Sequence, residues 1–272
     1  MPGSSCRDLH NVGPMDGVQA VLIDIDGVLT VSWEPVPGAA EALARIQRAG
    51  LGTRLVTNTT SRTRAEIAEL LGRAGFEVDA ATILTASAAT ADYLAEHYPG
   101  ARCLLLNSGD IREDLADVDF VDADPDVVVV GGAGPEFSYE ALDRAFGYLF
   151  RGVPLVAMHR NRYWRTDQGL RLDSGAFVQG LEHAADVRAV VVGKPAAEFF
   201  AAALRALDTP AKAAVMVGDD IESDVLGAQE GGITGVLVRT GKYDEAAVAA
   251  APGRPDHVLG SFAELPALLD VV

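Results

Sequence analysis

Two aspartates stand two positions apart directly after the first long apolar run of the chain. They are Asp24 and Asp26 in the segment DIDGVLT, which follows VQAVLI. On an extended chain, residues i and i+2 point to the same side, so we expect both carboxylates on one side. One carboxylate of such a pair can stay ionised as a nucleophile while its neighbour holds or releases a proton. The alternative for this pair alone is an acidic surface turn, where Asp and Gly are common.

A second acidic group follows the apolar run AAVMV near the other end of the chain. It lies in the segment GDDIESD, and its members are Asp219, Asp220, Glu222 and Asp224. Mg²⁺ prefers oxygen ligands, commonly one or two carboxylates together with waters and phosphate oxygens. Asp219, Asp24 and the backbone carbonyl of Asp26 could supply such ligands. Acids also stabilise the first turn of a helix through its dipole, and we assign Glu222 to that role.

Two further polar segments follow apolar runs and offer groups that bind phosphate. Lys194 lies after a valine run and is fixed between Gly193 and Pro195, and its charge could neutralise carboxylates or a phosphate oxygen. Thr57 and Asn58 offer a hydroxyl group and amide donors. The structural alternatives are an ordinary solvated lysine and a turn with capping residues. Taken singly, each of these two segments leaves both interpretations open.

The elements that must position these groups alternate between apolar runs and amphipathic stretches. We expect strands at residues 18–25, 53–57, 103–106, 127–130, 154–158, 213–217 and 235–238. We expect helices at 39–49, 62–74, 88–97, 139–151, 196–207 and 223–230, with Ser61 capping the second. Unbroken apolar strands between helices predict a Rossmann-like α/β core with a parallel sheet covered on both faces. Ligands of such sheets bind beyond the carboxyl ends of the strands, where all four polar segments lie.

The middle of the chain has a strand–helix rhythm of its own. We therefore expect an inserted α/β domain at residues 83–189, between the two parts of a core domain at 18–82 and 190–272. Within the inserted domain we interpret residues 173–176 as a loop. Residues 1–17 are polar and rich in Gly, Pro and Ser, which is typical of a flexible N-terminal tail.

The composition of the chain limits the classes of binding partner and the cellular compartment that we expect. The 272-residue chain has 22 basic and 39 acidic side chains and a net charge of −17, which disfavours nucleic acid and membrane surfaces as partners. An anionic substrate would therefore need a site with its own local positive charge. The two cysteines make no disulfide framework, which favours a reducing, cytoplasmic location. No apolar run approaches the roughly 18 residues of a membrane span.

Together and in this order, the four polar segments resemble the motifs of the haloacid dehalogenase-like hydrolase superfamily. DIDGVLT looks like its first motif, Thr57-Asn58 like the second, Lys194 like the third and GDDIESD like the fourth. The segments MHRNRYW, VVVGKPAAEFF and RTGKY are similar to the class IIA capped phosphatases, near the phospholysine phosphohistidine inorganic pyrophosphate phosphatase-like branch. This resemblance covers nearly the whole chain. It implies a parallel-sheet core with an α/β cap inserted after the second motif.

The same resemblance implies a Mg²⁺-dependent phosphatase that works through an aspartyl-phosphate on Asp24. Asp26 would protonate the leaving oxygen and then take a proton from the attacking water. Thr57, Asn58 and Lys194 would hold the phosphate oxygens. The implied metal ligands are Asp24, Asp26, Asp219 and Asp224, the last of them directly or through a water. The expected substrate is a small phosphorylated metabolite or a phosphoanhydride.

A basic and aromatic segment of the expected cap could choose the leaving group. His159, Arg160, Arg162, Tyr163 and Trp164 stand close together, which is unusual in a chain of this net charge. They could face the substrate, and the alternative is a strand and turn with packed aromatic rings. We also expect the cap to close over the site and two copies of the chain to form a homodimer through it.

Two other functions use the same residue types. A receiver-type phospho-acceptor also needs Asp carboxylates, Mg²⁺, Thr and Lys, but it is usually much shorter and presents its lysine after both acids. Here Asp219 follows Lys194. The other alternative is a catalytically silent phosphate-binding protein on the same fold, although every catalytic position is occupied. Turnover separates the alternatives, because a receiver holds its phosphate and a phosphatase releases it.

Overall fold

The structure, a computed structural model, describes Met15, residues 17–166 and residues 169–271. The expected N-terminal tail therefore lies almost entirely outside the described residues. The chain divides into two compact units, each of which is described by itself. Unit 1 comprises the described residues up to Leu55, Ala74–Glu77 and the residues from Leu204 onward, and unit 2 comprises Val56–Arg73 and Val78–Ala203.

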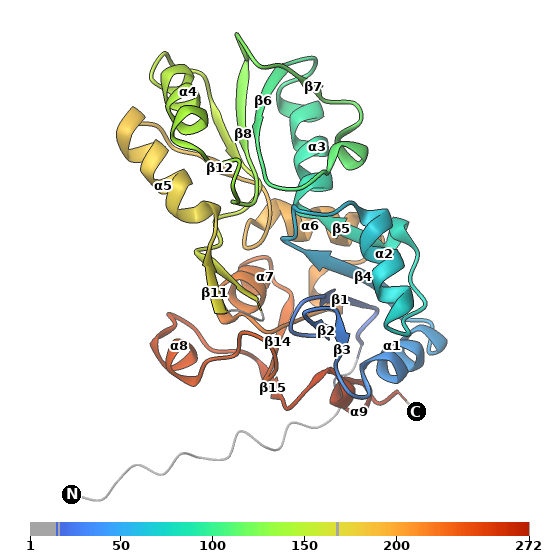
Figure 1. Ribbon diagram of the computed structural model, residues 1–272. Helices are drawn as coiled ribbons and strands as arrows, with labels where there is room; N and C mark the ends of the chain where they lie inside the picture. Colours follow the sequence, from blue (N-terminus) through green and yellow to red (C-terminus); the bar gives the residue numbers. More distant parts are fainter. Residues whose placement is uncertain (1–14, 16, 167–168, 272) are drawn as a thin grey trace, which may run out of the picture. The chain divides into compact units, whose positions relative to one another are not determined.

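A parallel sheet forms the centre of unit 1 (Figure 1). Its strands are β1 (Ala20–Asp24), β4 (Gly52–Thr57, which the unit boundary divides), β13 (Ala214–Gly218), β14 (Thr234–Val238) and β15 (His257–Leu259). Within unit 1 the strand order is β15-β14-β13-β1-β4. The short strand β5 (Ile83–Thr85) belongs to unit 2. β1 pairs with β13, β13 with β14 and β14 with β15, each in parallel. Every residue of β1 and β13 is buried, which explains their unbroken apolar sequences.

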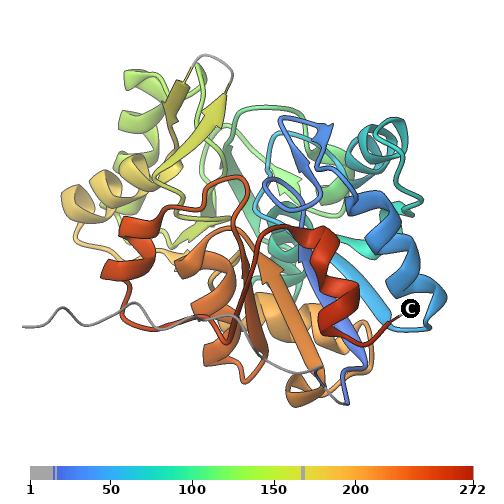
Figure 2. The same cartoon turned by 90° about the horizontal axis from the view of Figure 1, so that it is seen from below.

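The described α-helices and the remaining strands of unit 1 are short apart from one amphipathic helix. They are α1 (Ala39–Arg48), α7 (Gly227–Glu230), α8 (Glu245–Ala250), α9 (Leu265–Leu268) and a hairpin of β2 (Thr30–Val31) with β3 (Glu34–Pro35). α1 buries Ala39, Ala42, Leu43 and Ile46, a spacing that places apolar side chains on one helical face. α1 and α9 lie side by side in both views (Figures 1 and 2).

Unit 2 has a five-stranded parallel sheet of its own with the order β12-β9-β8-β6-β7. Its strands are β6 (Arg102–Leu106), β7 (Asp119–Phe120), β8 (Val127–Val130), β9 (Leu155–Ala157) and β12 (Val190–Val191). Helices α4 (Tyr139–Leu149) and α5 (Ser174–Ala185) lie side by side on one face, and α3 (Ala86–His97) lies on the other (Figure 1). Val128, Val130, Leu149 and Leu181 belong to the core between the sheet and α4 and α5.

Three further elements belong wholly or mainly to unit 2. They are α2 (Arg64–Arg73), α6 (Ala197–Arg205) and an antiparallel hairpin of β10 (Tyr163–Thr166) with β11 (Gly169–Leu172). Trp164 and Leu172 in this hairpin are 46% and 61% exposed, so these large apolar side chains do not contribute to a packed core.

Two local predictions from the sequence are wrong. Ser61 does not cap the second helix, because α2 begins at Arg64 and Thr63 bonds reciprocally with Glu66. The Thr63 N–H donates to Glu66 Oε2 at 2.9 Å and the Glu66 N–H donates to Thr63 Oγ1 at 3.2 Å. Residues 174–176 are not a loop but the first turn of α5. Asp173 caps that helix by accepting a hydrogen bond from the Ser174 N–H at 2.7 Å.

The predicted α/β class with a parallel-sheet core is confirmed. The limits of the expected core and cap domains stay a prediction. Among the described residues, no helix combines the length and the apolar character that crossing a bilayer requires.

Candidate active site

The pairing of β1 with β13 brings the first and fourth polar segments to one edge of the unit 1 sheet. Ile23 is level with Val217 in this register, so Asp24 ends its strand beside Gly218, and Asp219 follows immediately. Asp24 is 6% exposed and Asp219 is 2% exposed. The strand that ends at Asp24 and the strand that ends directly before Asp219 are fully buried, and both aspartates are withdrawn from water with them.

A π-helical turn, Ile221–Leu226, returns Asp224 to the same edge. Asp220 caps this turn by accepting hydrogen bonds from the N–H groups of Glu222 and Ser223, both at 3.0 Å. The Asp220 N–H in turn donates to Asp224 Oδ2 at 3.2 Å, and Asp224 is 1% exposed. The helix expected at 223–230 therefore begins two residues earlier and in π form, a geometry frequent at functional sites. Glu222 lies exposed in its first turn, as expected.

The loop that follows β14 closes around Asp219. The Lys242 N–H donates to Asp219 Oδ2 at 2.6 Å, and the Thr240 hydroxyl donates to the Gly27 carbonyl oxygen. Gly27 and Gly241 have φ values of +95° and +60°. A Cβ atom would lie 1.8 Å from Asp219 Oδ2 at Gly27 and 2.0 Å from it at Gly241. Only glycine leaves room for the carboxylate at both positions.

Three carboxylates therefore converge in unit 1. One oxygen each of Asp24, Asp219 and Asp224 lies within 4.8 Å of the other two. Burial raises the pKa of Asp219 well above its ordinary value, and repulsion from Asp24 and Asp224 adds to this effect. Asp219 Oδ1 is buried and has no hydrogen-bond partner among the described residues. A hard divalent cation would satisfy this oxygen and relieve the repulsion, so the donor set fits such an ion.

Lys242 is a charged member of this cluster that the sequence analysis did not single out. Its side chain is half-buried. Burial alone would lower the pKa of its amine, but the charges of Asp219, Asp24, Asp224 and Asp220 outweigh burial and raise it. The available signal was its position in RTGKY, directly after the strand β14. Ligands of a parallel sheet bind beyond the carboxyl ends of its strands, and this strand-end rule identified the four other polar segments. The same rule applies to the segment that contains Lys242.

Asp26 lies in a different environment from Asp24. β1 ends at Asp24, so Asp26 lies outside the strand, and the expectation that the two carboxylates lie on one side stays a prediction. The chain turns instead, with the Gly27 N–H donating to the Thr30 carbonyl at 2.6 Å. Asp26 is exposed, and its Oδ1 accepts a hydrogen bond from the Ser32 N–H at 3.4 Å. Its roles in proton transfer and metal binding stay predictions.

In unit 2, the second and third polar segments are joined to each other. The Lys194 N–H donates to Asn58 Oδ1 and Asn58 Nδ2 donates to the Lys194 carbonyl, both at 2.9 Å. Lys194 is 4% exposed, and its Nζ donates to the Val56 carbonyl at 3.5 Å. Thr57 is 3% exposed and its hydroxyl donates to Thr59 Oγ1 at 3.0 Å. Whether these residues meet the carboxylates of unit 1 stays a prediction.

The Asn58 side chain has a positioning role that the sequence did not reveal. Its carboxamide bonds both backbone groups of Lys194, and Nδ2 also donates to Asn161 Oδ1 at 3.3 Å. With its side chain engaged in this way, the backbone N–H is the group of Asn58 that we expect to bind phosphate.

His159 is an internal residue of unit 2. It is 2% exposed, with Nε2 at 3.5 Å from Thr60 Oγ1 and Nδ1 at 3.4 Å from Ser174 Oγ. The Asn161 N–H also donates to Nδ1 at 3.3 Å. The hydrogen bond between His159 and Ser174 connects the segment after β9 with the start of α5. Contact of His159 with a substrate stays a prediction.

Comparison with known proteins identifies the family of this chain. The family model described as haloacid dehalogenase-like hydrolase matches residues 21–121, and the model described as HAD-hydrolase-like matches residues 191–265. The haloacid dehalogenase-like hydrolase domain-containing protein 2 of Rattus norvegicus is 41% identical over 232 residues, which are 84% of this chain and 87% of the relative. The chain belongs to the haloacid dehalogenase-like hydrolase family. The resemblance stated from the motifs is thereby confirmed.

A further relative and two solved structures agree with this assignment. The phospholysine phosphohistidine inorganic pyrophosphate phosphatase of Rattus norvegicus is 37% identical over 261 residues, 94% of this chain and 95% of the relative. Among solved structures, p-nitrophenyl phosphatase from Archaeoglobus fulgidus is 28% identical, with a TM-score of 0.85 over 91% of this chain and 98% of that one. NagD from E. coli K-12 is 29% identical, with a TM-score of 0.82 over the same shares.

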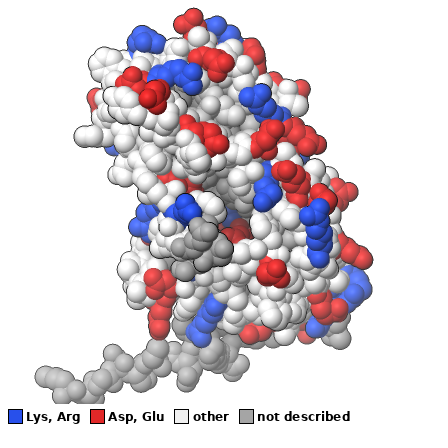
Figure 3. Space-filling view, in the orientation of Figure 1, with Lys and Arg blue, Asp and Glu red and all other residues white. Residues whose placement is uncertain are grey.

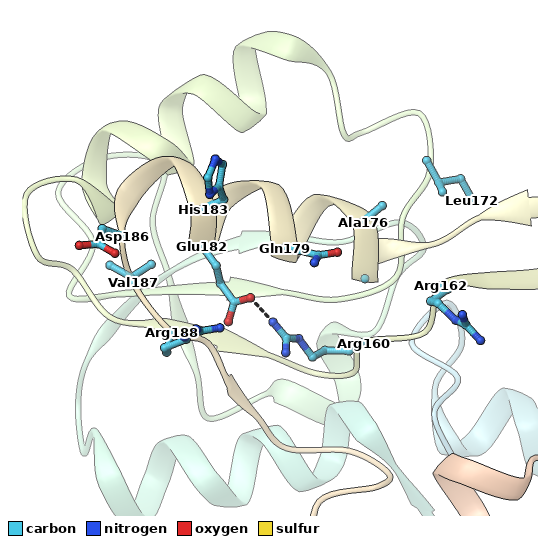
Figure 4. A pocket seen from close by; sticks show the side chains of 11 residues that line it. Arg160, Arg162, Leu172, Ala176, Gln179, Glu182, His183, Asp186, Val187 and Arg188 are labelled. Carbon is cyan, nitrogen blue, oxygen red and sulfur yellow. Dashed lines mark hydrogen bonds and ion pairs between the residues drawn. The ribbon is translucent and has the colours of Figure 1, made fainter. Parts of the chain in front are cut away.

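The two matched segments contain the carboxylate cluster, Thr57, Asn58 and Lys194, whereas residues 122–190 lie between them. This intervening segment forms a pocket of about 660 Å³ beneath α5 in unit 2 (Figure 4). Arg160, Arg162, Arg188 and Gln179 line it, and Arg160 is held by an ion pair with Glu182. In a haloacid dehalogenase-like hydrolase of net charge −17, this pocket concentrates positive charge.

Proposed function

We propose that this chain is a Mg²⁺-dependent phosphatase that hydrolyses a small phosphorylated metabolite or a phosphoanhydride through an aspartyl-phosphate on Asp24. The observation that carries the proposal is the convergence of Asp24, Asp219 and Asp224 within 4.8 Å of one another. Family membership supports hydrolysis, and relatives named as pyrophosphate and p-nitrophenyl phosphatases support phosphate esters and anhydrides as the substrate class.

Mg²⁺ is the ion that we assign to the carboxylate cluster. Asp24, Asp219 and Asp224 would hold it, together with the backbone carbonyl of Asp26. When bound, the ion offsets the repulsion between the phosphate and the acidic residues around it. The buried Asp219 Oδ1, which has no hydrogen-bond partner among the described residues, is the atom with the strongest need for a cation.

Asp24 is the nucleophile in the proposed reaction. Its carboxylate oxygen attacks phosphorus in line with the leaving oxygen, so an aspartyl-phosphate forms as the bond to the leaving group breaks. Asp26 donates a proton to that leaving oxygen and next accepts one from the water that attacks the aspartyl-phosphate. The exposure of Asp26 supports this role, because it can exchange protons with solvent while the buried Asp24 remains in place.

Thr57, the backbone N–H of Asn58 and the ammonium of Lys194 are the groups that we expect to hold the phosphoryl oxygens. The hydrogen bonds between the Asn58 side chain and the Lys194 backbone support a joint role, because they fix these two residues relative to each other. Donors that are already oriented stabilise developing charge without reorganising during the reaction.

The arginine-lined pocket supports a substrate with a second anionic group. Three guanidinium groups against the carboxylates of Glu182 and Asp186 leave the pocket with a net positive charge. Arginine binds phosphate and carboxylate groups through paired hydrogen bonds. We therefore propose that Arg162 contributes to choosing the leaving group, as its sequence context suggested.

The proposal is tested by phosphate release from a broad panel of phosphate esters and anhydrides, including 4-nitrophenyl phosphate, with Mg²⁺ and with EDTA. The wild type should release phosphate only with the metal, and Asp24→Asn should lose at least about a thousandfold in kcat, the scale expected when a nucleophile is removed. Asp143→Asn, on the exposed surface of α4, is the matched control and should keep wild-type activity. An active and correctly folded Asp24→Asn variant would remove Asp24 from the mechanism.

A further inference from the structure

The loop 240–243 connects a lysine to the carboxylate cluster through the backbone as well as through charge. The Lys242 N–H bonds Asp219 Oδ2 at 2.6 Å, and Gly241 approaches the same oxygen so closely that a Cβ atom there would lie 2.0 Å from it. Thr240 donates to the Gly27 carbonyl and thereby holds the loop against the segment that follows Asp24. The start of the Lys242 side chain is thus fixed beside Asp219.

Lys242 is also an unusual residue in this chain. Of the 22 basic residues only three are lysines, at positions 194, 212 and 242, and the rest are arginines. Lys212 is exposed, whereas Lys242 is half-buried and its backbone N–H bonds Asp219. The charges of Asp219, Asp24, Asp224 and Asp220 raise the pKa of the Lys242 amine. A lysine ammonium is a compact point charge that fits beside a metal-sized cluster, where the planar guanidinium of arginine needs more space.

The charges of the carboxylate cluster in unit 1 indicate the role of the Lys242 ammonium group. Three ionised carboxylates carry three negative charges, and Lys242 with one divalent cation supplies three positive charges. With the cation alone the cluster would retain one excess negative charge facing an anionic substrate. A fixed positive charge near a cation site weakens the binding of the cation and strengthens the binding of an anion.

We propose that Lys242 is a positioning residue that shares the three carboxylates with the divalent cation and thereby sets the balance between cation affinity and phosphate affinity at this site. The inference rests on the proposed function, because it assumes that the cation and the phosphoryl group meet at this cluster. It adds a second ammonium group to the one that the sequence motifs assigned to Lys194.

A purely structural role for Lys242 makes a different prediction. The hydrogen bond to Asp219 comes from the backbone N–H and survives any replacement of the side chain by another non-proline residue. If Lys242 only filled space, its replacement would loosen the loop and weaken the binding of both ions together. If its charge matters, the two affinities should move in opposite directions.

The experiment measures two dissociation constants by calorimetry on the full chain at neutral pH. The first is for Mg²⁺ alone, and the second is for inorganic phosphate at saturating Mg²⁺. Lys242→Met removes the charge and keeps much of the side-chain volume, Lys242→Arg keeps the charge, and Lys212→Met removes an exposed lysine of unit 1 as the matched control. Thermal unfolding in EDTA reports whether each variant is folded.

We expect Lys242→Met to bind Mg²⁺ about tenfold more tightly and phosphate about tenfold more weakly, the size of effect that one unit charge has at short range in a half-buried site. Lys242→Arg should shift both constants in the same directions but by less, and Lys212→Met should shift neither. Parallel changes in the two affinities, or none in Lys242→Met, would overturn the inference. If Lys242→Met fails to fold, the same tests apply to Lys242→Gln. A wild type that binds no Mg²⁺ would instead contradict the proposed function.

Discussion

At the scale of single residues, Asp219 has the clearest electrostatic conflict in unit 1. Its carboxylate is buried, faces Asp24 and Asp224, and has one oxygen without a hydrogen-bond partner among the described residues. Burial first, and then those two neighbours, raise its pKa. A carboxyl group whose pKa is higher in the folded than in the unfolded protein destabilises the folded state at pH values above its unfolded pKa. The metal-free protein should therefore lose stability as pH rises through the window between the two pKa values.

Asp219→Asn tests this conflict. The amide removes the repelled charge and its oxygen can still accept the Lys242 N–H, so in EDTA at pH 7.5 the variant should melt about 2–4 °C above the wild type. The difference should shrink as pH falls toward the unfolded pKa, because the wild-type carboxyl becomes protonated. Excess Mg²⁺ should raise the Tm of the wild type and leave that of Asp219→Asn almost unchanged. A variant that is less stable than the wild type in EDTA at every pH would contradict this account.

At the scale of elements, the site depends on where strands end and how tightly the following loops turn. The register of β1 with β13 sets Asp24 next to Gly218, the π-helical turn returns Asp224, and the loop after β14 closes on Asp219. Each of these loops contains a position where the backbone approaches a carboxylate. Substitutions there should affect metal binding more than stability.

Gly241→Ala tests the closure of the loop after β14. Its added Cβ would lie 2.0 Å from Asp219 Oδ2, so the loop must shift and the Mg²⁺ affinity should fall at least about tenfold, or about 1.4 kcal/mol. Gly50→Ala is the matched control, because Gly50 also has a positive φ, of +78°, but an added Cβ there meets nothing within 4 Å. Both variants carry the backbone strain, and only Gly241→Ala should lose the metal. Equal Mg²⁺ affinities in the two variants would show that the close approach is unimportant.

The strand-end rule explains which parts of the site could be predicted from the sequence. Buried parallel strands have continuous apolar sequences, so β1, β8, β13 and β14 could be located, and the polar segments that follow β1 and β13 could be identified with them. The environment of Asp26 could not be predicted from the sequence, because the turn after β1 depends on the Gly27 backbone. The capping of α2 and the start of α5 were missed, because Ser, Thr and Asp are each good caps and the sequence offers several within a few positions. The role of the Asn58 side chain requires contacts with residues far along the chain.

At the scale of the whole molecule, the distribution of charge matters more than its sum. On the face shown in Figure 3, acidic and basic side chains are interspersed although the net charge is −17. The described pocket beneath α5 nevertheless gathers Arg160, Arg162 and Arg188 (Figure 4). An acidic chain that binds an anion needs such local exceptions.

Arg162→Ala tests whether this pocket selects substrates. For substrates with a second anionic group, KM should rise about tenfold, since a charge-assisted hydrogen bond contributes about 1.5–3 kcal/mol. KM for 4-nitrophenyl phosphate, which has no second anion, should change little. Arg171→Ala is the matched control, because Arg171 lies on β11 of the hairpin that begins directly after Arg162 and is not among the residues that line the pocket. Unchanged KM values across the panel would remove Arg162 from substrate selection.

The central claim is that Asp24 carries the phosphoryl group during turnover. The most direct measurement is an acid quench of the enzyme during turnover of 4-nitrophenyl phosphate with Mg²⁺, followed by peptide mapping by mass spectrometry. Asp26→Ala should slow the hydrolysis of the aspartyl-phosphate and thereby increase the amount of this intermediate in the quenched sample. We expect the mass of one phosphoryl group on the peptide that contains Asp24, and none in Asp24→Asn or in EDTA. Phosphate release by the same samples without any phosphorylated Asp24 peptide, in the wild type and in Asp26→Ala, would contradict the account.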